Sequence, residues 1–288
     1  MKDIVITVRS GDGTFNIESI QKFEEWKNGE KNTNILLEKC GRKLFNILHN
    51  DLNYIQITTE GLFSFKFVLG IDKEETTMRL MGHIAEAIIV SRCGNNPQLN
   101  REYATYARKG KKVVRTPDKF IAIGTGHHKT KLKYASKHNP NHTQNDVIWI
   151  NKENPEIELL EINNNSPGGK TAALQIKASN LKSDYIVNEI KKDKYTVPII
   201  YFGMKDNYSK IKRKLKEYNK FDHMNFVDVR DIDEDAHEEF LEYKSIVDKL
   251  ISGELNPRGL LDTQDTLLSK SALATALNIC NINDTLLI

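Results

Sequence analysis

The chain has 288 residues, a formal net charge of +3 and a globular composition, with 39% hydrophobic and 28% charged residues. No run approaches the roughly 20 consecutive apolar residues of a membrane-spanning helix, and the charged start of the chain is unlike a signal peptide. The three cysteines, Cys40, Cys93 and Cys280, form no Cys-x-x-Cys pair, which argues against a disulfide framework and a cysteine-rich zinc site. We expect a cytoplasmic protein with no membrane association and with reduced, buried cysteines.

Residues 1–72 are expected to form a small α+β module. Apolar residues at helical spacing follow Thr33, a suitable N-cap residue, and Glu60-Gly61 has hairpin character between two strands. In chain order, the expected elements are a strand over residues 4–8, a helix over 17–26, a helix that begins at Thr33, and strands over 54–59 and 62–69. These elements are sufficient for a core of their own.

Residues 73–225 are expected to form a catalytic core. Their hydrophobic patterns follow the order helix, three strands, helix, strand, which predicts a mixed sheet flanked by helices. The expected elements are a helix over residues 74–93, strands over 146–150, 157–162 and 172–178, a helix over 180–192, and a strand over 197–202. Residues 163–169, between the second and third of these strands, are rich in turn-forming residues.

Residues 226–288 are expected to form a helical region. Apolar residues recur at helical spacing from Ala236 to Leu250, and a last helix is expected over residues 263–280. The region is acidic, because residues 221–262 contain four basic and twelve acidic residues, a balance of −8.

Residues 101–137 carry the opposite charge, with eleven basic and two acidic residues, a balance of +9. Neutralisation of phosphates supplies most of the non-specific affinity of proteins for nucleic acid, so this segment predicts contact with a polyanion. The residues expected to contact nucleic acid are Arg108, Lys109, Lys111, Lys112, Arg115, His127, His128, Lys129, Lys131 and Lys133.

A polar pair stands out in the predicted strand over residues 172–178. Alternation along a strand sends Gln175 and Lys177 to one face and their apolar neighbours to the other. Asp146 begins another predicted strand about thirty residues upstream. An acid followed at this distance by Gln-x-Lys resembles the PD-(D/E)xK nuclease superfamily, which includes many restriction endonucleases. The resemblance implies an α/β (α+β) fold with a restriction-endonuclease-like mixed sheet, in addition to the N-terminal module and the C-terminal helices.

The resemblance also implies a function, namely a Mg²⁺-dependent endonuclease of double-stranded DNA in a restriction or phage-defence system. Asp146 would be the principal ligand of the Mg²⁺, with Mn²⁺ as the alternative ion, and the backbone carbonyl of Ile176 would be a further ligand. Lys177 would orient the attacking water and offset negative charge at the phosphorus. A homodimer is expected as well, because a cut in both strands generally needs two active sites.

The chain departs from the superfamily pattern at Gln175, where an Asp or Glu is usual. An amide is a weaker ligand for magnesium than a carboxylate, so a second acid is expected at the site. Glu86 is the first candidate, because it is the one formal charge in an otherwise apolar stretch of its helix, where an unpaired carboxylate is costly. Glu161 and Glu158, on the predicted strand over residues 157–162, are the alternatives.

Three other interpretations are compatible with parts of the sequence. Residues 166–171 end like a phosphate-binding loop with Lys170 in the lysine position, although the first glycine is absent and the following segment alternates like a strand. The histidines from His127 to His142 form no recognisable zinc-binding spacing. A non-catalytic DNA-binding protein with a degenerate nuclease core is favoured by Gln175.

Overall fold

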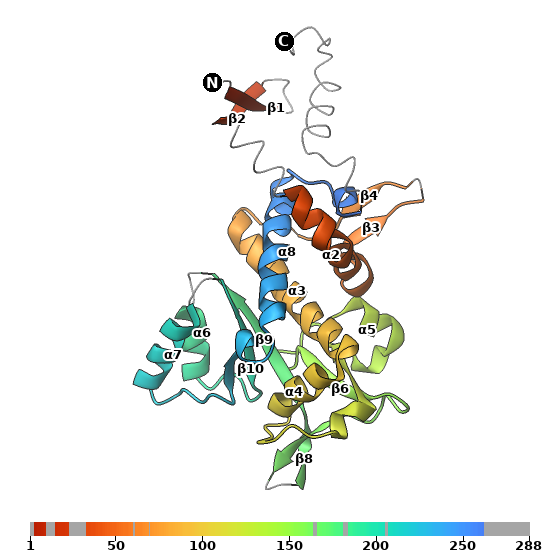
Figure 1. Cartoon of the computed structure of the whole chain (residues 1–288), viewed down its shortest axis with the longest axis vertical. Helices are drawn as coiled ribbons and strands as arrows, with labels where there is room; N and C mark the ends of the chain where they lie inside the picture. Colours follow the sequence, from red (N-terminus) through yellow and green to blue (C-terminus); the bar gives the residue numbers. More distant parts are fainter. Residues whose placement is uncertain are drawn as a thin grey trace.

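The structure, a computed structural model, is a mixed α/β fold around one five-stranded sheet (Figure 1). It describes residues 3–9, 15–22, 33–59, 61–68, 70–163, 166–180, 184–204 and 207–261. The mixed sheet with flanking helices confirms the fold class expected from the sequence. Within the described residues, no helix is both long and apolar enough to cross a membrane.

The sheet has the strand order β11-β10-β9-β6-β5. In this order the strands are β11 (Phe226–Asp228), β10 (Ile199–Gly203), β9 (Ala173–Ser179), β6 (Val147–Asn151) and β5 (Phe120–Gly124). Strand β6 is antiparallel to its two neighbours, β5 and β9, whereas β9, β10 and β11 run parallel to one another. The parallel pair β9 and β10 needs a crossover, which α6 (Asp184–Lys191) supplies.

One face of the sheet packs against the largest apolar core of the molecule. This core includes Trp149 of β6 and Leu174 of β9, and three helices contribute to it. The helices are α3 (Lys73–Asn95), α4 (Pro97–Ala107) and α8 (Glu234–Ser252). Both predicted helices among these, over residues 74–93 and from Ala236 to Leu250, are confirmed, whereas α4 was not predicted.

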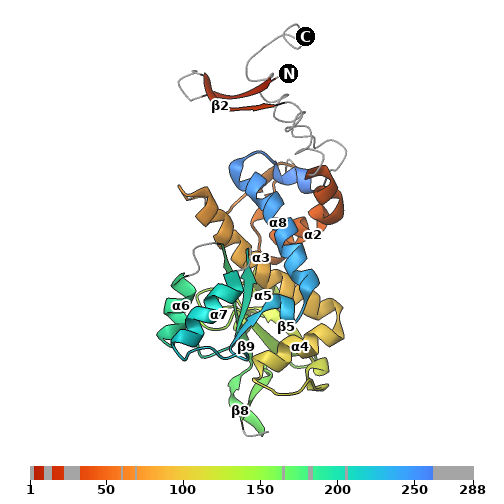
Figure 2. The same ribbon diagram turned by 60° about the vertical axis from the view of Figure 1, so that its left-hand side comes forward.

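The opposite face of the sheet packs against α6 (Asp184–Lys191) and α7 (Asn207–Glu217). Tyr201 of β10 packs there with Ile186 of α6 and Ile211 of α7 in a separate apolar cluster. Figure 2 shows these two helices together beside β9. Because alternate residues of β9 point to opposite faces, Leu174 and Ile176 enter the α3 core, and Gln175 and Lys177 are directed toward the side of α6.

The N-terminal part differs from the prediction in one element. Residues 17–22, expected as the start of a helix, lie in β2 (Phe15–Lys22), which pairs antiparallel with β1 (Asp3–Arg9). The pairing shifts register between Ile6 and Thr7, so that Glu18 has no partner. This bulge interrupts the two-residue alternation and leaves apolar residues three apart, which imitates helical spacing.

The rest of the N-terminal part follows the prediction. A helical segment extends over residues 33–51, and β3 (Ile55–Ile57) and β4 (Phe63–Phe65) form a hairpin whose turn has Gly61 at a φ of 79°. Leu44 and Ile55 belong to the same apolar core as α3 and α8. The segment over residues 33–59 therefore shares its core with the helices that cover the sheet.

The predicted strand over residues 157–162 does not enter the main sheet as a full strand. Only a short bridge joins it to β6, through Ile150 and Glu158, and the chain then forms β7 (Leu160–Asn163), which pairs with β8 (Ser166–Thr171). The reason is that β9 occupies the same edge of β6, through the pair Val147 and Leu174. Strand β5, which was not predicted, supplies the third antiparallel strand.

The remaining predictions have mixed outcomes. The helix over residues 180–192 and the strand over 197–202 are confirmed as α6 and β10, and Cys40 and Cys93 are buried free thiols. The last predicted helix, over residues 263–280, and Cys280 lie outside the described residues.

Candidate active site

Asp146 lies where β6 and β9 separate. The two strands pair at Val147 and Leu174, and the backbone N–H of Asp146 still donates to the carbonyl of Leu174 at 2.9 Å. Beyond this point the carboxylate of Asp146 replaces a backbone carbonyl as the hydrogen-bond partner of β9. Its Oδ2 accepts a hydrogen bond from the backbone N–H of Ile176 at 2.7 Å. The side-chain amide of Gln175 donates to the same oxygen. The structure therefore brings together Asp146, Gln175 and Ile176, as expected.

Lys177 completes this group on β9. Its Nζ lies 4.9 Å from the ring centroid of Tyr195, and its ammonium forms no ion pair within the described part of the chain. Its positive charge lowers the pKa of Asp146, as do the hydrogen bonds from Ile176 and Gln175. Burial is the stronger effect, and it raises the pKa of Asp146 to about 6.

Glu86 approaches the group from α3. Its side chain is 16% exposed, and burial raises the pKa of its carboxyl well above the usual range. The charge of Asp146 raises this pKa further, whereas Lys177 lowers it. The predicted proximity of Glu86 to Asp146 and Lys177 is thus reflected in their electrostatic interaction.

His127 is a further member of the group, which the sequence indicated only as a surface residue. Its side chain is 3% exposed and its Nε2 lies 3.7 Å from Oε2 of Glu86. Burial lowers the pKa of this imidazole to about 3, with smaller effects from His83 and Lys129, so the ring is neutral. The signal in the sequence was its position just after the buried strand β5.

The imidazole of His127 packs directly on Gly124, the last residue of β5. A Cβ atom at Gly124 would lie 2.4 Å from both Cε1 and Nε2 of the ring, closer than any side chain allows. Glycine is therefore required at this position for the ring to lie where it does. His127 is also the residue that precedes α5 (His128–Lys133), so its backbone is held by a helix start.

His83 and Tyr54 extend the group away from the sheet. His83 precedes Glu86 by three residues on α3, so the two side chains lie on the same face of the helix. Nδ1 of His83 and the hydroxyl of Tyr54 are 2.9 Å apart. Burial, followed by the negative charge of Glu86, raises the pKa of Tyr54 to about 12.

Two buried polar atoms of the group have no hydrogen-bond partner, namely Oε1 of Gln175 and Nε2 of His127. Such atoms are costly unless a ligand or water supplies the partner. No group of three or more His, Cys, Asp or Glu side chains is arranged to hold a metal ion among the residues that the structure describes. A cation here would be held by fewer acids, with amide and backbone oxygens.

We compared the chain with protein-family models, curated proteins and solved structures, and none matched.

The backbone of Ile176 is suitably placed for the role expected of it. Its N–H points toward Asp146, and in a strand the carbonyl of the same residue points to the same edge. Glu161 has a different position. It is buried on β7 and forms an ion pair with Lys109 at 2.8 Å, and Glu158 forms one with Lys137 at 2.9 Å. Neither alternative acid has a contact with Asp146 in the described residues.

The basic segment over residues 101–137 is less available to a polyanion than its charge suggests. Arg108 and His127 are buried, which removes both from the predicted surface. Lys109 pairs with Glu161, and Lys129 pairs with Asp51 at 3.0 Å. Among the predicted contacts, the exposed lysines and arginines without an ion pair in the described chain are Lys111, Lys112, Arg115, Lys131 and Lys133, whereas His128 is half-buried.

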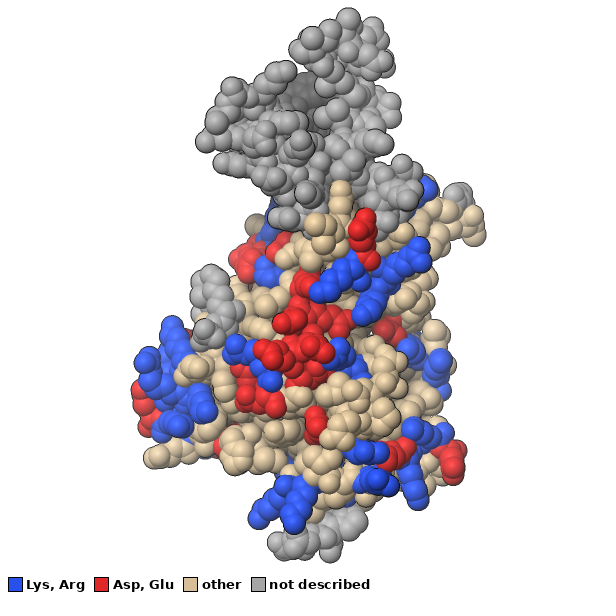
Figure 3. Space-filling model, viewed as in Figure 1, with Lys and Arg blue, Asp and Glu red and all other residues tan. Residues whose placement is uncertain are grey.

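A second basic surface, which was not predicted from the sequence, lies over α6 and α7. We call it the α6–α7 basic surface. Its bases without an ion pair in the described chain are Lys191, Lys192, Lys210, Lys212, Arg213 and Lys216. Aromatic rings lie among them, since Nζ of Lys191 is 3.7 Å from the ring centroid of Tyr218. Figure 3 shows the cluster of basic side chains over these helices.

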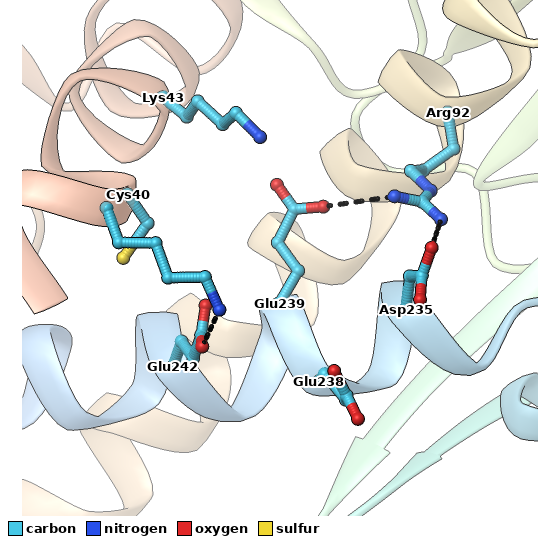
Figure 4. A pocket seen from close by; sticks show the side chains of 8 residues that line it. Cys40, Lys43, Arg92, Asp235, Glu238, Glu239 and Glu242 are labelled. Atoms are coloured by element: carbon cyan, nitrogen blue, oxygen red, sulfur yellow. Dashed lines mark hydrogen bonds and ion pairs between the residues drawn. The ribbon is translucent and has the colours of Figure 1, made fainter.

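The acidic C-terminal region lies along α8, beside the α6–α7 basic surface in the same view (Figure 3). Its acids are partly neutralised by bases from other elements, because Lys39 pairs with Glu242, and Arg92 lies 3.9 Å from Glu239. Figure 4 shows these side chains around a pocket of about 220 Å³ between the helical segment over residues 33–51, α3 and α8. None of Asp146, Gln175, Lys177, Glu86 and His127 lines this pocket.

Proposed function

We propose that the chain is a divalent-metal-dependent nuclease that hydrolyses phosphodiester bonds of double-stranded DNA. The observation that carries the proposal is the meeting of Asp146 with Gln175 and Ile176 at the point where β6 and β9 separate. Glu86 and Lys177 are close enough to influence the charge at this point. Two partly buried carboxylates can bind a divalent cation, and a lysine beside them can stabilise negative charge at the phosphorus, as metal-assisted phosphodiester hydrolysis needs.

These residues fit a divalent cation. Oε1 of Gln175 is buried without a partner, and burial disfavours the negative charges of Asp146 and Glu86 unless a cation offsets them. A bound Mg²⁺ or Mn²⁺ would supply Lewis-acid stabilisation of the phosphoryl oxygens and make a water molecule more acidic. Asp146, Glu86 and the carbonyl of Ile176 would hold it.

Lys177 would act on the substrate. Hydrolysis joins the oxygen of one water to phosphorus and breaks one P–O bond to the sugar, and negative charge accumulates on the phosphoryl oxygens. The ammonium of Lys177 has no carboxylate partner in the described chain, so its charge is free to offset this accumulation and to orient the water. Tyr195, whose ring lies beside Nζ, limits where the ammonium can point.

The order of elements also supports the proposal. Along the chain, α3, β5, β6, β9, α6 and β10 follow the order helix, three strands, helix, strand that the resemblance to PD-(D/E)xK nucleases implies, with α4, α5 and the β7–β8 hairpin between them. Strand β5 precedes β6, so Asp146 lies before the second of the three strands and not, as expected from the sequence, before the first. The two basic surfaces supply positive charge for a DNA backbone. A homodimer in a cytoplasmic restriction or phage-defence system is the setting that the same resemblance favours.

The interpretation of residues 166–171 as a phosphate-binding loop does not fit the structure. Such a loop must lead into a helix, whereas Ser166–Thr171 is strand β8 and Ala173–Ser179 is strand β9. Lys170 is exposed on β8. The non-catalytic DNA-binding protein remains the second candidate, because Gln175 replaces the usual acid.

The direct test is cleavage of methylated and unmethylated plasmid with Mg²⁺, with Mn²⁺ and with EDTA. We expect cleavage with a divalent cation, and its loss in Asp146→Asn and Lys177→Met while DNA binding is retained. Lys170→Met is the matched control, since it removes an exposed lysine from the neighbouring hairpin, and it should cut normally. Binding without cleavage under every condition would favour the non-catalytic candidate.

A further inference from the structure

On the basis of the metal-dependent function proposed above, we infer that His127 is a ligand of the divalent cation together with Glu86. An imidazole ligand selects Mn²⁺, or another transition-metal ion, over Mg²⁺. This role differs from the surface contact with nucleic acid that the sequence suggested for His127, because the side chain is buried.

The first observation is the unsatisfied nitrogen of a buried ring. Nε2 of His127 is inaccessible to solvent and has no hydrogen-bond partner, although the side chain is only 3% exposed. A buried polar atom without a partner is costly, because it has lost its hydrogen bonds to water. A ligand that binds this nitrogen would remove the cost.

The second observation is the distance of 3.7 Å between Nε2 of His127 and Oε2 of Glu86. This is too long for a hydrogen bond, so the two groups do not satisfy each other. Bonds from a transition metal to nitrogen and oxygen are about 2.1 Å, so one ion can touch two atoms separated by up to about 4.2 Å. The separation is therefore suitable for a shared cation.

The ring is also held in place. Gly124 fixes it by direct packing, because any larger residue would overlap it. An immobilised imidazole beside a carboxylate supplies the nitrogen and oxygen ligands that transition-metal sites use.

The selectivity follows from ligand chemistry. Carboxylate, carbonyl and water oxygens suit Mg²⁺, whereas imidazole favours transition metals. Glu86 alone would supply an oxygen ligand, and His127 adds the one nitrogen. In the described chain, no three acids or histidines are arranged around a single point. Glu86 and His127 would therefore be the two protein ligands in place, and water or phosphate would complete the coordination of the cation.

The test is Mn²⁺ binding to the full chain, without DNA. Pulsed electron paramagnetic resonance detects the nitrogen of an imidazole bound directly to Mn²⁺, and calorimetry gives the affinities for Mn²⁺ and Mg²⁺. We expect the nitrogen signal in the wild type, its loss in His127→Ala, and a Mn²⁺ affinity at least tenfold weaker in that variant. The affinity for Mg²⁺ should fall less, so that the preference for Mn²⁺ decreases.

Two further variants separate ligation from folding. His128→Ala removes the adjacent, half-buried histidine and should keep the nitrogen signal, whereas Gly124→Ala should displace the ring and weaken it. A wild type without bound Mn²⁺ or without the nitrogen signal, or a signal that persists in His127→Ala, overturns the assignment. A wild type that shows the signal but cuts no DNA supports the ligand assignment and refutes the nuclease.

Discussion

Asp146 and Ile176 are joined by a hydrogen bond of 2.7 Å from the backbone N–H of Ile176 to Oδ2 of the carboxylate. This bond continues the pairing of β6 with β9 by one step, with a side chain in place of a backbone carbonyl. It fixes one carboxylate oxygen at the edge of β9, beside Gln175 and Lys177. Together with the pairing of Val147 with Leu174 and the hydrogen bond from Gln175, this contact positions Asp146 against β9.

The first prediction concerns the pH dependence of stability without metal. Burial raises the pKa of Asp146 from 3.8 to about 6, so the folded protein holds a proton that the unfolded chain has released in this range. The free energy of unfolding should therefore fall as pH rises from about 4 to about 6, by about 2–3 kcal/mol relative to Asp146→Asn. Urea unfolding of both proteins in EDTA at several pH values measures the difference. The free energy of unfolding of the wild type minus that of Asp146→Asn should fall with pH, and a value that stays constant or increases would contradict the raised pKa.

The second prediction concerns the cost of a second buried carboxylate. Glu86 is disfavoured as an anion by burial and by Asp146, so Glu86→Gln should raise the free energy of unfolding in EDTA at pH 7 by about 1 kcal/mol or more. The same variant should lose most of the thermal stabilisation by Mn²⁺, because a ligand is gone. Glu153→Gln, on an exposed loop, is the control and should change neither quantity. Thermal unfolding with and without Mn²⁺ gives both results, and a destabilised Glu86→Gln would contradict this account.

The sequence was sufficient for the parts of the site that depend on local pattern. The alternation in β9 placed Gln175 and Lys177 on one face, and the isolated charge of Glu86 in an apolar helix indicated a buried acid. Both signals are local, because a strand repeats every two residues and a helix every 3.6. Asp146 followed from the resemblance and from the strand that it precedes.

Other features could not be read from local pattern, because they depend on partners far along the chain. The burial of His127 requires α5 to fold back on Gly124 and α3. The ion pair of Lys109 with Glu161 joins residues that belong to different elements. Strand β5 is a short, wholly apolar segment, and such a segment is compatible with a strand or with part of a buried helix.

The third prediction concerns the contact that holds α8 against α3. Asp233 is buried, accepts a hydrogen bond from Nε of Arg92 at 2.8 Å, and caps α8 through the N–H of Ala236 at 3.1 Å. Asp233→Ala removes the cap and leaves the guanidinium without its main partner, so we expect a loss of about 3 kcal/mol in urea unfolding. Asp235→Ala, whose side chain is 79% exposed, should cost less than about 1 kcal/mol. Equal effects of the two variants would mean that the buried contact is not the one that stabilises α8.

The last prediction tests which basic surface contacts DNA. In the Asp146→Asn background, which we expect to bind DNA without cutting it, the affinity for a DNA duplex is measured by fluorescence anisotropy at several salt concentrations. The log of the affinity falls as the log of the salt concentration rises, and each lost phosphate contact reduces the magnitude of this slope by about 0.9. Neutralising Lys210, Arg213 and Lys216, the exposed bases of α7, should lower the slope by about 2–3.

The same experiment includes two comparisons. Replacing Lys111, Lys112 and Arg115 by Gln should also lower the slope, because these bases are exposed and unpaired in the described chain. Replacing Lys39 and Lys43 by Gln is the control, since both line the acidic pocket beside α8 and should have no effect. The α6–α7 basic surface lies on the side of the sheet toward which Lys177 is directed, so we expect DNA bound there to reach the proposed site. A slope unchanged by the α7 substitutions would exclude this path and leave the surface around Arg115 as the route to Asp146.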